Sequence, residues 1–351
     1  MPRIFSIYQN KLIIYNTKTN PNQNALLSLI KNQLGVKNII EDSSTSKVYL
    51  NKNGDLVVKS VEYKSDTDLG TPLYTFGLLS DTHIDGDGDD YGNSISDLNN
   101  AIQFFENEGC EFIAYCGDMT YDGRSEDFTA LKSCIDTSTI PNYTIRGNHD
   151  ASNTVDMYKN ATGMEQDYTI TKNNDLFIFM SMDNDDETIS WGLTNSKITW
   201  LTNLLQANTD KRIFLFYHIP IRGTCGDGGG GLYPWGMIGD NSTTLGNNYI
   251  NLVKAYPNLI VINGHSHFKF SLQDSYTNAN YYHNNGECYF VHVPSCARPR
   301  IENPSASDGI DDYTEGSEGF LVEVYADKVL FKPRNFVSNE YLLEYAYIVE
   351  L

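Results

Sequence analysis

The chain has 351 residues, 40% of them hydrophobic. A chain of this length and composition can bury one large core and a small second domain, which excludes an intrinsically disordered protein. Its 45 Asp and Glu residues outnumber 25 Lys and Arg residues, and the resulting formal charge of −20 excludes long nucleic acid as an expected partner, because an acidic surface repels polyanions.

The first 65 residues predict a small α+β or β-rich module. Residues 4–15 are typical of a hairpin, residues 24–34 of a helix and residues 48–61 of a second hairpin with Asn53-Gly54 as its turn. Residues 66–72 are a polar stretch with the composition of a linker. We therefore expect a domain boundary there, with the larger domain at 73–351. No residue cluster in the module indicates chemistry, and docking or oligomerisation is the only role we can suggest for it.

From residue 73 onward, strand-like and helical segments alternate, as in βαβ units. Predicted strands lie at 74–79, 111–116, 142–145, 176–181, 213–217 and 259–262. Predicted helices lie between them at 96–108, 124–135, 196–207 and 245–255. The last part of the chain is strand-rich, with predicted strands at 268–272, 289–293, 320–325 and 329–333.

Five short polar runs follow the apolar stretches and contain five of the seven histidines: Asp81-Thr82-His83, Gly117-Asp118, Gly147-Asn148-His149-Asp150, His218 and Gly264-His265-Ser266-His267. Strand ends are where α/β proteins usually place their chemistry. A strand-end Asp or a Gly-Asp turn is by itself more often a cap or turn residue. Taken together, the carboxylate, amide and imidazole donors indicate a two-metal hydrolase site suited to transition metals rather than calcium.

In order and approximate spacing, these runs resemble the motifs of the calcineurin-like metallophosphoesterase superfamily, over residues 73 to about 333, and lean toward its phosphodiesterase and acid-phosphatase-like branch. The resemblance implies an α/β fold, the two-sheet αββα sandwich with helices on both outer faces. It implies hydrolysis of a small-molecule or nucleotide phosphate ester, either a diester or a monoester. It also implies two transition-metal ions, Mn, Fe or Zn, with a bridging hydroxide as the attacking group.

Carried over to this sequence, the resemblance implies that one metal is held by Asp81, His83, Asp118 and His267. The other would be held by Asp118, Asn148, His218 and His265, so that Asp118 bridges the two. His149 is left without a metal, and by the same resemblance it would protonate the leaving oxygen or stabilise the transition state. Asp150 would orient the His149 ring or, alternatively, cap a helix that starts near Ala151.

Substrate contacts are expected from the loop after His218. Arg222 is the candidate for contact with phosphate, and Tyr233 or Trp235 for contact with the organic group of the substrate. The glycine cluster at 226–231 fits GxGxxG formally, but no helix pattern follows it, so it predicts a loop at the rim of the pocket.

Two further patterns resemble metal sites without completing them. The acidic run at 85–90 resembles the start of an EF-hand loop, but Asp90 and Ser96 occupy the positions that need Gly and Glu, so we expect a solvated loop. Tyr121 completes the Gly-Asp-x-x-Tyr pattern of purple acid phosphatases, in which tyrosinate binds iron. Because His83 stands where that family has glycine, we expect Tyr121 to pack near the site rather than bind a metal.

The remaining features concern compartment. The six cysteines form no CxxC pair and predict reduced, packed thiols. Residues 1–17 lack the apolar core of a signal peptide, and no segment approaches the ~20 apolar residues of a membrane span. We therefore expect a cytoplasmic or otherwise soluble protein without a membrane partner.

Two alternative functions stay open. The first is a nuclease of the same superfamily, which the charge and the absence of a basic stripe disfavour for long polymers. The second is a retained scaffold that acts as a structural or binding component, which the complete set of metal-type residues disfavours.

Overall fold

The computed structural model describes residues 5–8, 11–14, 39–42, 48–50, 56–59 and 69–351, the last range with gaps at 89, 153, 185–190, 227–235, 241–242, 273–280, 284–285, 303–309 and 313–315. The chain forms two compact units, Met1–Gly70 and Thr71–Leu351. Within these described ranges, no helix has the length and apolar character needed to cross a membrane.

The described part of the first unit consists of short strands. Strand β1 (Phe5–Tyr8) pairs antiparallel with β2 (Lys11–Ile14), and β4 (Val48–Leu50) pairs antiparallel with β5 (Leu56–Lys59), as in the two predicted hairpins. Strand β3 (Ile39–Asp42), parallel to β5, is not indicated by the sequence pattern. The predicted helix at 24–34 lies outside the described residues.

One sheet of the second unit has seven strands, in the order β19-β18-β17-β6-β7-β8, with β20 also paired to β18. Its strands are β6 (Tyr74–Leu79), β7 (Ile113–Tyr115), β8 (Asn142–Thr144), β17 (Glu318–Val324), β18 (Lys328–Asn335), β19 (Glu340–Tyr341) and β20 (Tyr347–Glu350). β6, β7 and β8 are parallel. The helices in this half are α3 (Ser94–Asn107), α4 (Ser125–Ile135), α5 (Asn148–Ala151) and α6 (Val155–Thr162).

The other sheet has six strands, in the order β13-β14-β12-β11-β10-β9. Its strands are β9 (Asp167–Lys172), β10 (Asp175–Met180), β11 (Ile213–Phe216), β12 (Leu259–Asn263), β13 (Tyr281–His283) and β14 (Tyr289–His292), and its helices are α7 (Asn195–Ala207) and α8 (Thr244–Lys254). Strands β10, β11, β12 and β14 are parallel neighbours. A separate antiparallel pair joins β15 (Arg300–Glu302) to β16 (Ile310–Asp312), and η2 (Leu343–Tyr345) precedes β20.

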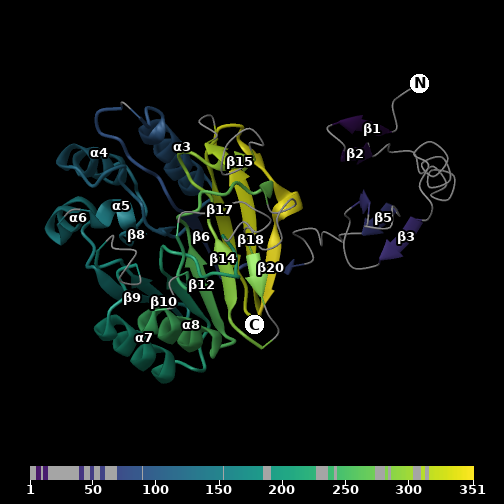
Figure 1. Cartoon of the computed structure of the whole chain (residues 1–351). Coiled ribbons are helices and arrows are strands. Elements are labelled where there is room, and N and C mark those ends of the chain that lie inside the picture. The colour runs from purple at the N-terminus through teal and green to yellow at the C-terminus, as the bar shows by residue number, and fades with distance from the viewer. Residues whose placement is uncertain are drawn as a thin grey trace. The chain divides into compact units, whose positions relative to one another are not determined.

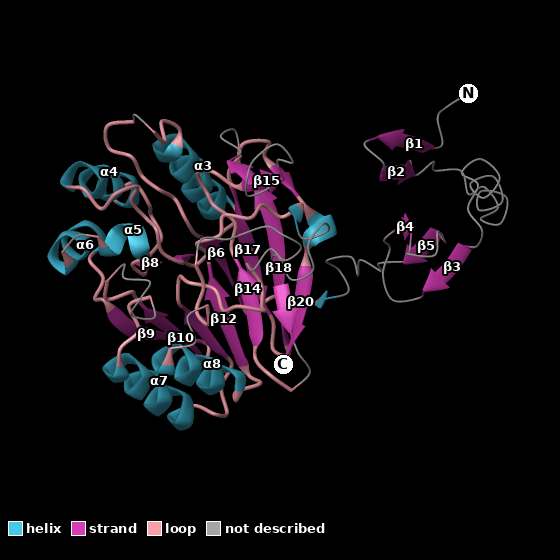
Figure 2. Cartoon of the chain, in the orientation of Figure 1, coloured by secondary structure: helices cyan, strands magenta, loops and turns pink. Residues whose placement is uncertain are grey.

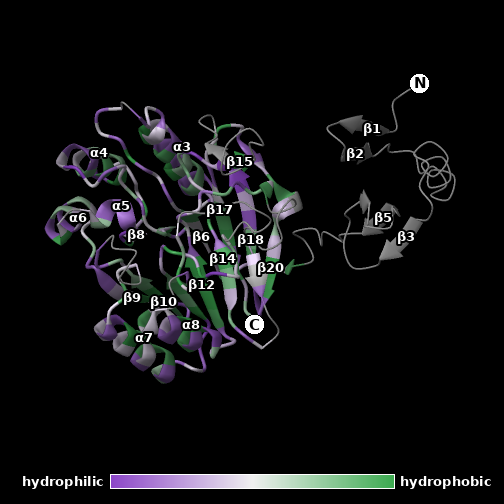
Figure 3. Ribbon diagram, viewed as in Figure 1, coloured by the Kyte–Doolittle hydropathy of each residue, from purple (hydrophilic) through white to green (hydrophobic). Residues whose placement is uncertain are grey.

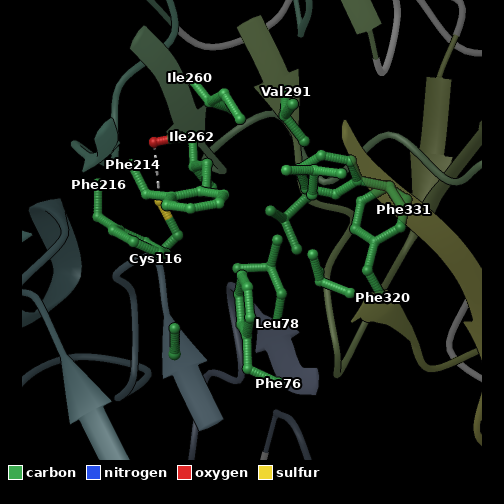
Figure 4. Packing of buried hydrophobic residues seen from close by; sticks show 14 of the residues in the cluster. Phe76, Leu78, Cys116, Phe214, Phe216, Ile260, Ile262, Val291, Phe320 and Phe331 are labelled. Atoms are coloured by element: carbon green, nitrogen blue, oxygen red, sulfur yellow. Dashed lines mark hydrogen bonds between the residues drawn. The ribbon is translucent and has the colours of Figure 1, made fainter. Parts of the chain in front are cut away.

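Successive side chains of a strand point to opposite faces of the sheet, and in the central strands both sets of side chains are apolar and buried. Phe214 on β11 packs between the sheets against Phe76 from the opposite sheet, with ring centroids 5.8 Å apart (Figure 4). Phe177 on β10 stacks on Phe214, with centroids 4.6 Å apart, and also contacts Phe76. The intervening Ile178 and Leu215 belong to a second core with α7 and α8. Parallel strands covered on both faces require such continuous apolar runs. The hydropathy colouring shows them as green central strands (Figure 3).

The helices lie outside the two sheets, as the αββα prediction requires. Helices α7 and α8 cover the outer face of the six-stranded sheet (Figure 2). Helices α3, α4 and α6 pack with β6, β7 and β17 on the outer face of the seven-stranded sheet (Figure 1). The predicted α/β sandwich is therefore confirmed.

The structure differs from the predicted elements at several places. The predicted strand at 268–272 is no strand, because this segment lies past the end of β12, and Phe268 makes only an isolated bridge to Arg300. The strand-like sequence pattern arises because Phe268, Phe270 and Leu272 are buried. Helix α6 and edge strand β9 carry much polar sequence and were not predicted. All six cysteines are free and buried, as predicted.

A buried carboxylate holds this segment against the seven-stranded sheet. Glu318, the first residue of β17, accepts a hydrogen bond of 2.8 Å from the backbone N–H of Phe270. Burial raises the pKa of Glu318 to about 7, because few polar groups replace the water that a charged carboxylate needs. The folded protein therefore holds a proton here that the unfolded chain gives up at lower pH.

We predict that Glu318→Gln flattens the pH dependence of stability. Since the pKa is raised on folding, the free energy of unfolding falls as the pH rises from the ordinary carboxyl value to about 7. The variant should lack this loss, which is on the order of 3 kcal/mol. Urea unfolding at a series of pH values measures it, with exposed Glu340→Gln as the control. Parallel curves for wild type and Glu318→Gln would contradict the assignment.

Candidate metal centre

The predicted ligands all lie in loops at the carboxyl ends of parallel strands. Asp81 and His83 follow β6, Asp118 follows β7, and Asn148 follows β8. In the other sheet, His218 follows β11, and the two remaining histidines of the Gly-His-Ser-His run follow β12. Because the carboxyl ends of parallel strands share one edge, both sheets deliver their polar residues to the same end of the sandwich.

Five of these residues have left-handed backbone conformations: Asp81 (φ 52°), His83 (φ 41°), Asp118 (φ 49°), His265 (φ 70°) and His267 (φ 57°). Such conformations are unfavourable for residues with a Cβ atom and gather at functional sites. Backbone hydrogen bonds between the loops hold them, including Asp81 N–H to Gly117 O at 3.0 Å and His83 N–H to Asp118 O at 3.1 Å.

Three glycines let the loops approach closely. A Cβ atom on Gly117 would lie 2.6 Å from His218 Nδ1, and one on Gly147 would overlap the Asp118 carboxylate. A Cβ atom on Gly264 would overlap Ser80 and Asp81. The glycine in each of these motifs therefore has a steric role, since any side chain would displace a predicted ligand.

The first group of converging donors is Asp81, His83, Asp118 and His267, whose ligand atoms lie within 4.8 Å of one another. The Nε2 atoms of His83 and His267 are 2.8 Å apart, and His267 Nε2 is 3.1 Å from Asp81 Oδ1. Burial lowers the pKa of both imidazoles well below the usual value. Both rings are therefore neutral, the state in which imidazole binds metals.

The second group consists of Asp118, His218 and His265, and it shares Asp118 with the first. His218 donates from Nδ1 to the Cys116 carbonyl at 2.6 Å, which directs Nε2 to within 3.0 Å of Asp118 Oδ2. Asn148 Oδ1 lies 2.9 Å from His265 Nδ1. Burial alone would lower the pKa of His218, but the nearby carboxylates outweigh it and raise the pKa to about 9.

These donors fit transition-metal ions. Metal–nitrogen bonds of about 2.1 Å place neighbouring ligand atoms roughly 3–3.5 Å apart, close to the spacings in both groups. The Nε2 atom of His218 is buried and faces the Asp118 carboxylate at 3.0 Å, as expected of two ligands of one ion. The oxygen and imidazole set, without a thiolate, suits Mn, Fe or Zn.

His149 lies beside the first donor group without joining it. Its ring packs edge-on against that of His83, with centroids 4.7 Å apart. Its backbone N–H donates to Asp118 Oδ1 at 2.9 Å, and its Nδ1 donates to the Tyr121 carbonyl. Although burial opposes protonation, the Asp118 charge raises the pKa of His149 overall. The ring is thus fixed and able to carry a proton.

Asp150 contacts backbone rather than the His149 ring. Its buried carboxylate accepts hydrogen bonds from the N–H groups of Gly147 (3.0 Å), Met119 (3.0 Å) and Thr120 (2.9 Å), and from the Thr120 hydroxyl (2.7 Å). The contact to Gly147 caps helix α5. Asp150 thus lies within α5 rather than directly before a helix that starts near Ala151, and both roles considered from sequence stay predictions. The His149 ring nitrogen Nδ1 contacts the Tyr121 carbonyl.

The remaining candidates were three substrate contacts, a tyrosine near the site and the acidic run at 85–90. The exposed Arg222 is paired with Asp240 at 2.5 Å, and Tyr233 and Trp235 fall outside the described residues. Tyr121 packs near the site, its ring centroid 6.2 Å from that of His149. The solvated-loop expectation is wrong for Asp85, which is buried and accepts hydrogen bonds from the N–H groups of Asp90 and Tyr91, both at 2.9 Å.

One residue near the centre was missed from the sequence. His292, the last residue of β14, is fully buried and lies 3.0 Å through Nδ1 from Asn263 Oδ1, on the strand before His265. Burial lowers its pKa to about 3. It belongs to no recognisable motif, and only its place at the end of a predicted strand could have indicated it.

Comparison with known proteins agrees with this geometry. The sequence model of the calcineurin-like phosphoesterase family matches residues 74–269. A protein of Arcobacter nitrofigilis named "Probable glycerophosphodiester phosphodiesterase" is 26% identical over 160 residues, 40% of this chain, and the match spans only 55% of that relative's length. A "Probable cyclic nucleotide phosphodiesterase" of Colwellia psychrerythraea is 22% identical over 264 residues, 72% of this chain and 91% of the relative.

Solved structures share the fold. A dimetal phosphatase from Danio rerio superposes with a TM-score of 0.54 at 15% identity, over 78% of this chain and 99% of its own. GAP50, described as the anchor in the inner membrane complex of Plasmodium, superposes with a TM-score of 0.52 at 17% identity, over 79% and 88%. Since the family's sequence model covers more than half of the residues, including every predicted ligand, the chain belongs to the calcineurin-like phosphoesterase family.

Proposed function

We propose that the protein hydrolyses small-molecule phosphodiesters with two transition-metal ions, Mn, Fe or Zn. The observation that carries the proposal is the single carboxylate of Asp118, which belongs to both donor groups. A carboxylate shared in this way is the expected bridge of a dinuclear centre. When bound, two ions neutralise the charge of the phosphoryl oxygens and make hydroxide available near neutral pH.

Each side chain then has a proposed role. Asp81, His83 and His267 complete the first metal site with Asp118. Asn148, His218 and His265 complete the second. His149, with Nδ1 committed to the Tyr121 carbonyl, donates a proton from Nε2 to the leaving alkoxide. Asp150 acts through the backbone by tying the Gly147 turn to the loop that carries Asp118.

Two features favour a small diester as the substrate. Both curated relatives are named as phosphodiesterases, one for glycerophosphodiesters and one for cyclic nucleotides. The formal charge of −20 disfavours long polyanions while leaving small anions free to approach a cationic metal centre. A nuclease of the same family stays the second candidate.

A scaffold role remains the alternative from another class. The likeness to GAP50, described as an anchor, shows that the fold by itself does not imply an enzyme. Against this alternative, both donor groups are complete and buried here. The strain in five of these residues would bring no benefit to a protein that binds no metal.

A substrate panel tests the reaction class. We expect the Mn-loaded protein to hydrolyse bis(4-nitrophenyl) phosphate faster than 4-nitrophenyl phosphate, and to leave single-stranded DNA intact. Release of 4-nitrophenolate and gel electrophoresis provide the readouts. DNA cleavage without small-ester hydrolysis would favour the nuclease, and no turnover together with no bound metal would favour the scaffold.

Asp118→Asn should reduce metal binding. The wild type should hold about two ions per chain, and the variant about one or fewer, because a neutral amide is a poor bridge between two cations. Elemental analysis after dialysis measures the content. Asp136→Asn, at the exposed carboxyl end of α4, loses the same charge and should keep both ions. An Asp118→Asn protein with two tightly bound ions would refute the bridge.

His149→Ala should slow hydrolysis in a manner that depends on the leaving group. For a diester with an alkyl leaving group, kcat should fall about 10²–10⁴-fold, because the alkoxide needs a proton. The loss should be smaller for 4-nitrophenolate, which leaves without one. Metal content should not change, and His283→Ala, outside the centre, should alter neither rate. An equal loss for both leaving groups would exclude the acid role.

A further inference from the structure

A small cavity lies next to the first donor group. It has a volume of about 110 Å³ and is lined by Tyr91, Gly92, Asn93, Ser94, Ala297 and Arg298. Since water occupies about 30 Å³ in the liquid, the cavity has room for a small polar group such as a carboxylate or a phosphate. None of the sequence motifs includes its lining residues.

One wall of the cavity is fixed to the metal-binding residues through Tyr91. The Tyr91 ring stacks on that of His83, with centroids 5.1 Å apart and planes 27° apart. The buried carboxylate of Asp85 holds the Tyr91 backbone, and Arg124 in turn donates to that carboxylate at 3.0 Å. A single ring therefore separates the cavity from a predicted metal ligand.

The other wall is tied to the same centre through Ser295. Its hydroxyl donates to the Asp81 carbonyl at 2.8 Å and accepts from the N–H groups of Ala297 at 3.1 Å and Arg298 at 2.8 Å. The Arg298 guanidinium lies over the Tyr91 ring, 4.0 Å from its centroid, and also donates to the Asp90 carbonyl. Both contacts hold the guanidinium at the cavity.

The charge of Arg298 is not balanced by a carboxylate in an ion pair with any described residue. In the loop that Arg298 contacts, the side chains of Asp85 and Asp87 are instead paired with Arg124, at 3.0 and 2.7 Å. In a chain with 45 acidic and 25 basic residues, an arginine without an acidic partner is unexpected. A guanidinium beside a cavity is well suited to bind a carboxylate or phosphate.

We propose that this cavity binds a second anionic group of the substrate. Arg298 would bind that group, and the Tyr91 ring would hold the Arg298 guanidinium in position. The inference rests on the proposed function and narrows its substrate class. The protein would prefer phosphodiesters that carry a carboxylate or a further phosphate on one of the two alcohol groups. Arg298 would then determine specificity without taking part in bond cleavage.

Two matched diesters test the proposal: phenyl 4-nitrophenyl phosphate and 4-carboxyphenyl 4-nitrophenyl phosphate. Both release 4-nitrophenolate and differ by one carboxylate. We expect wild-type kcat/KM to be about tenfold or more higher for the carboxylate. Arg298→Gln should abolish that preference and leave the phenyl diester within about twofold of wild type. A 4-phosphonophenyl analogue shows whether phosphate or carboxylate is favoured.

Lys132→Gln provides the control, because it removes one positive charge from the exposed face of α4 and should keep the preference. A wild-type preference below about twofold, or an equal loss for both diesters in Arg298→Gln, would overturn the proposal. Calorimetric titration into His149→Ala of methyl benzyl phosphate and methyl 4-carboxybenzyl phosphate, whose alkoxide leaving groups that variant should release slowly, measures binding without turnover. Equal affinities for the two compounds would overturn the role of the cavity, even if the protein hydrolysed no ester. Tighter binding of the carboxylate compound without any hydrolysis would overturn only the proposed function.

Discussion

The candidate centre depends on a backbone constraint: five of its side chains extend from residues in the left-handed region. Each such residue costs on the order of 1–2 kcal/mol, and the cost is tolerated because the loops are short and bonded to one another. Glycines at Gly117, Gly147 and Gly264 leave the room in which neighbouring loops meet. The strands below are packed on both faces, so they cannot shift to relieve the strain. The fold itself therefore holds the donor side chains in place.

The buried donor groups and the arginines around them differ in charge. Burial keeps His83 and His267 neutral, with pKa values well below the usual range. Burial opposes the ionisation of Asp118 as well, but the neighbouring His218 holds its pKa well below the usual value, so it stays an anion. Around these donors, Arg124 neutralises the acidic loop, which leaves Arg298 as a cation at the adjoining cavity. An acidic protein thus keeps a region suited to anionic esters.

Much of the fold could be predicted because its strands carry continuous apolar runs that end in polar motifs; β6 has the predicted bounds. The motif residues from Asp81 to His267 also meet in space, since parallel strands carry them to one edge. The rest depends on contacts that no local pattern encodes. The buried Asp85 carboxylate is paired with Arg124 from another loop, and Tyr91 meets Arg298 from a segment more than two hundred positions away. Residues 268–272 resemble a strand in sequence because Phe268, Phe270 and Leu272 are all buried.

The two sheets contribute unequally to the centre: four predicted ligands follow strands of the seven-stranded sheet, and three follow strands of the six-stranded sheet. Ions coordinated by both sets would add a further link between the two layers of the sandwich, which already meet here through hydrogen bonds such as that from His218 Nδ1 to the Cys116 carbonyl. The occupancy of the metal sites and the melting temperature of the protein would then be linked, because an ion that binds only the folded chain raises its stability by mass action. A chelator would weaken the contact between the two sheets before it disturbed the strand pairing within either sheet.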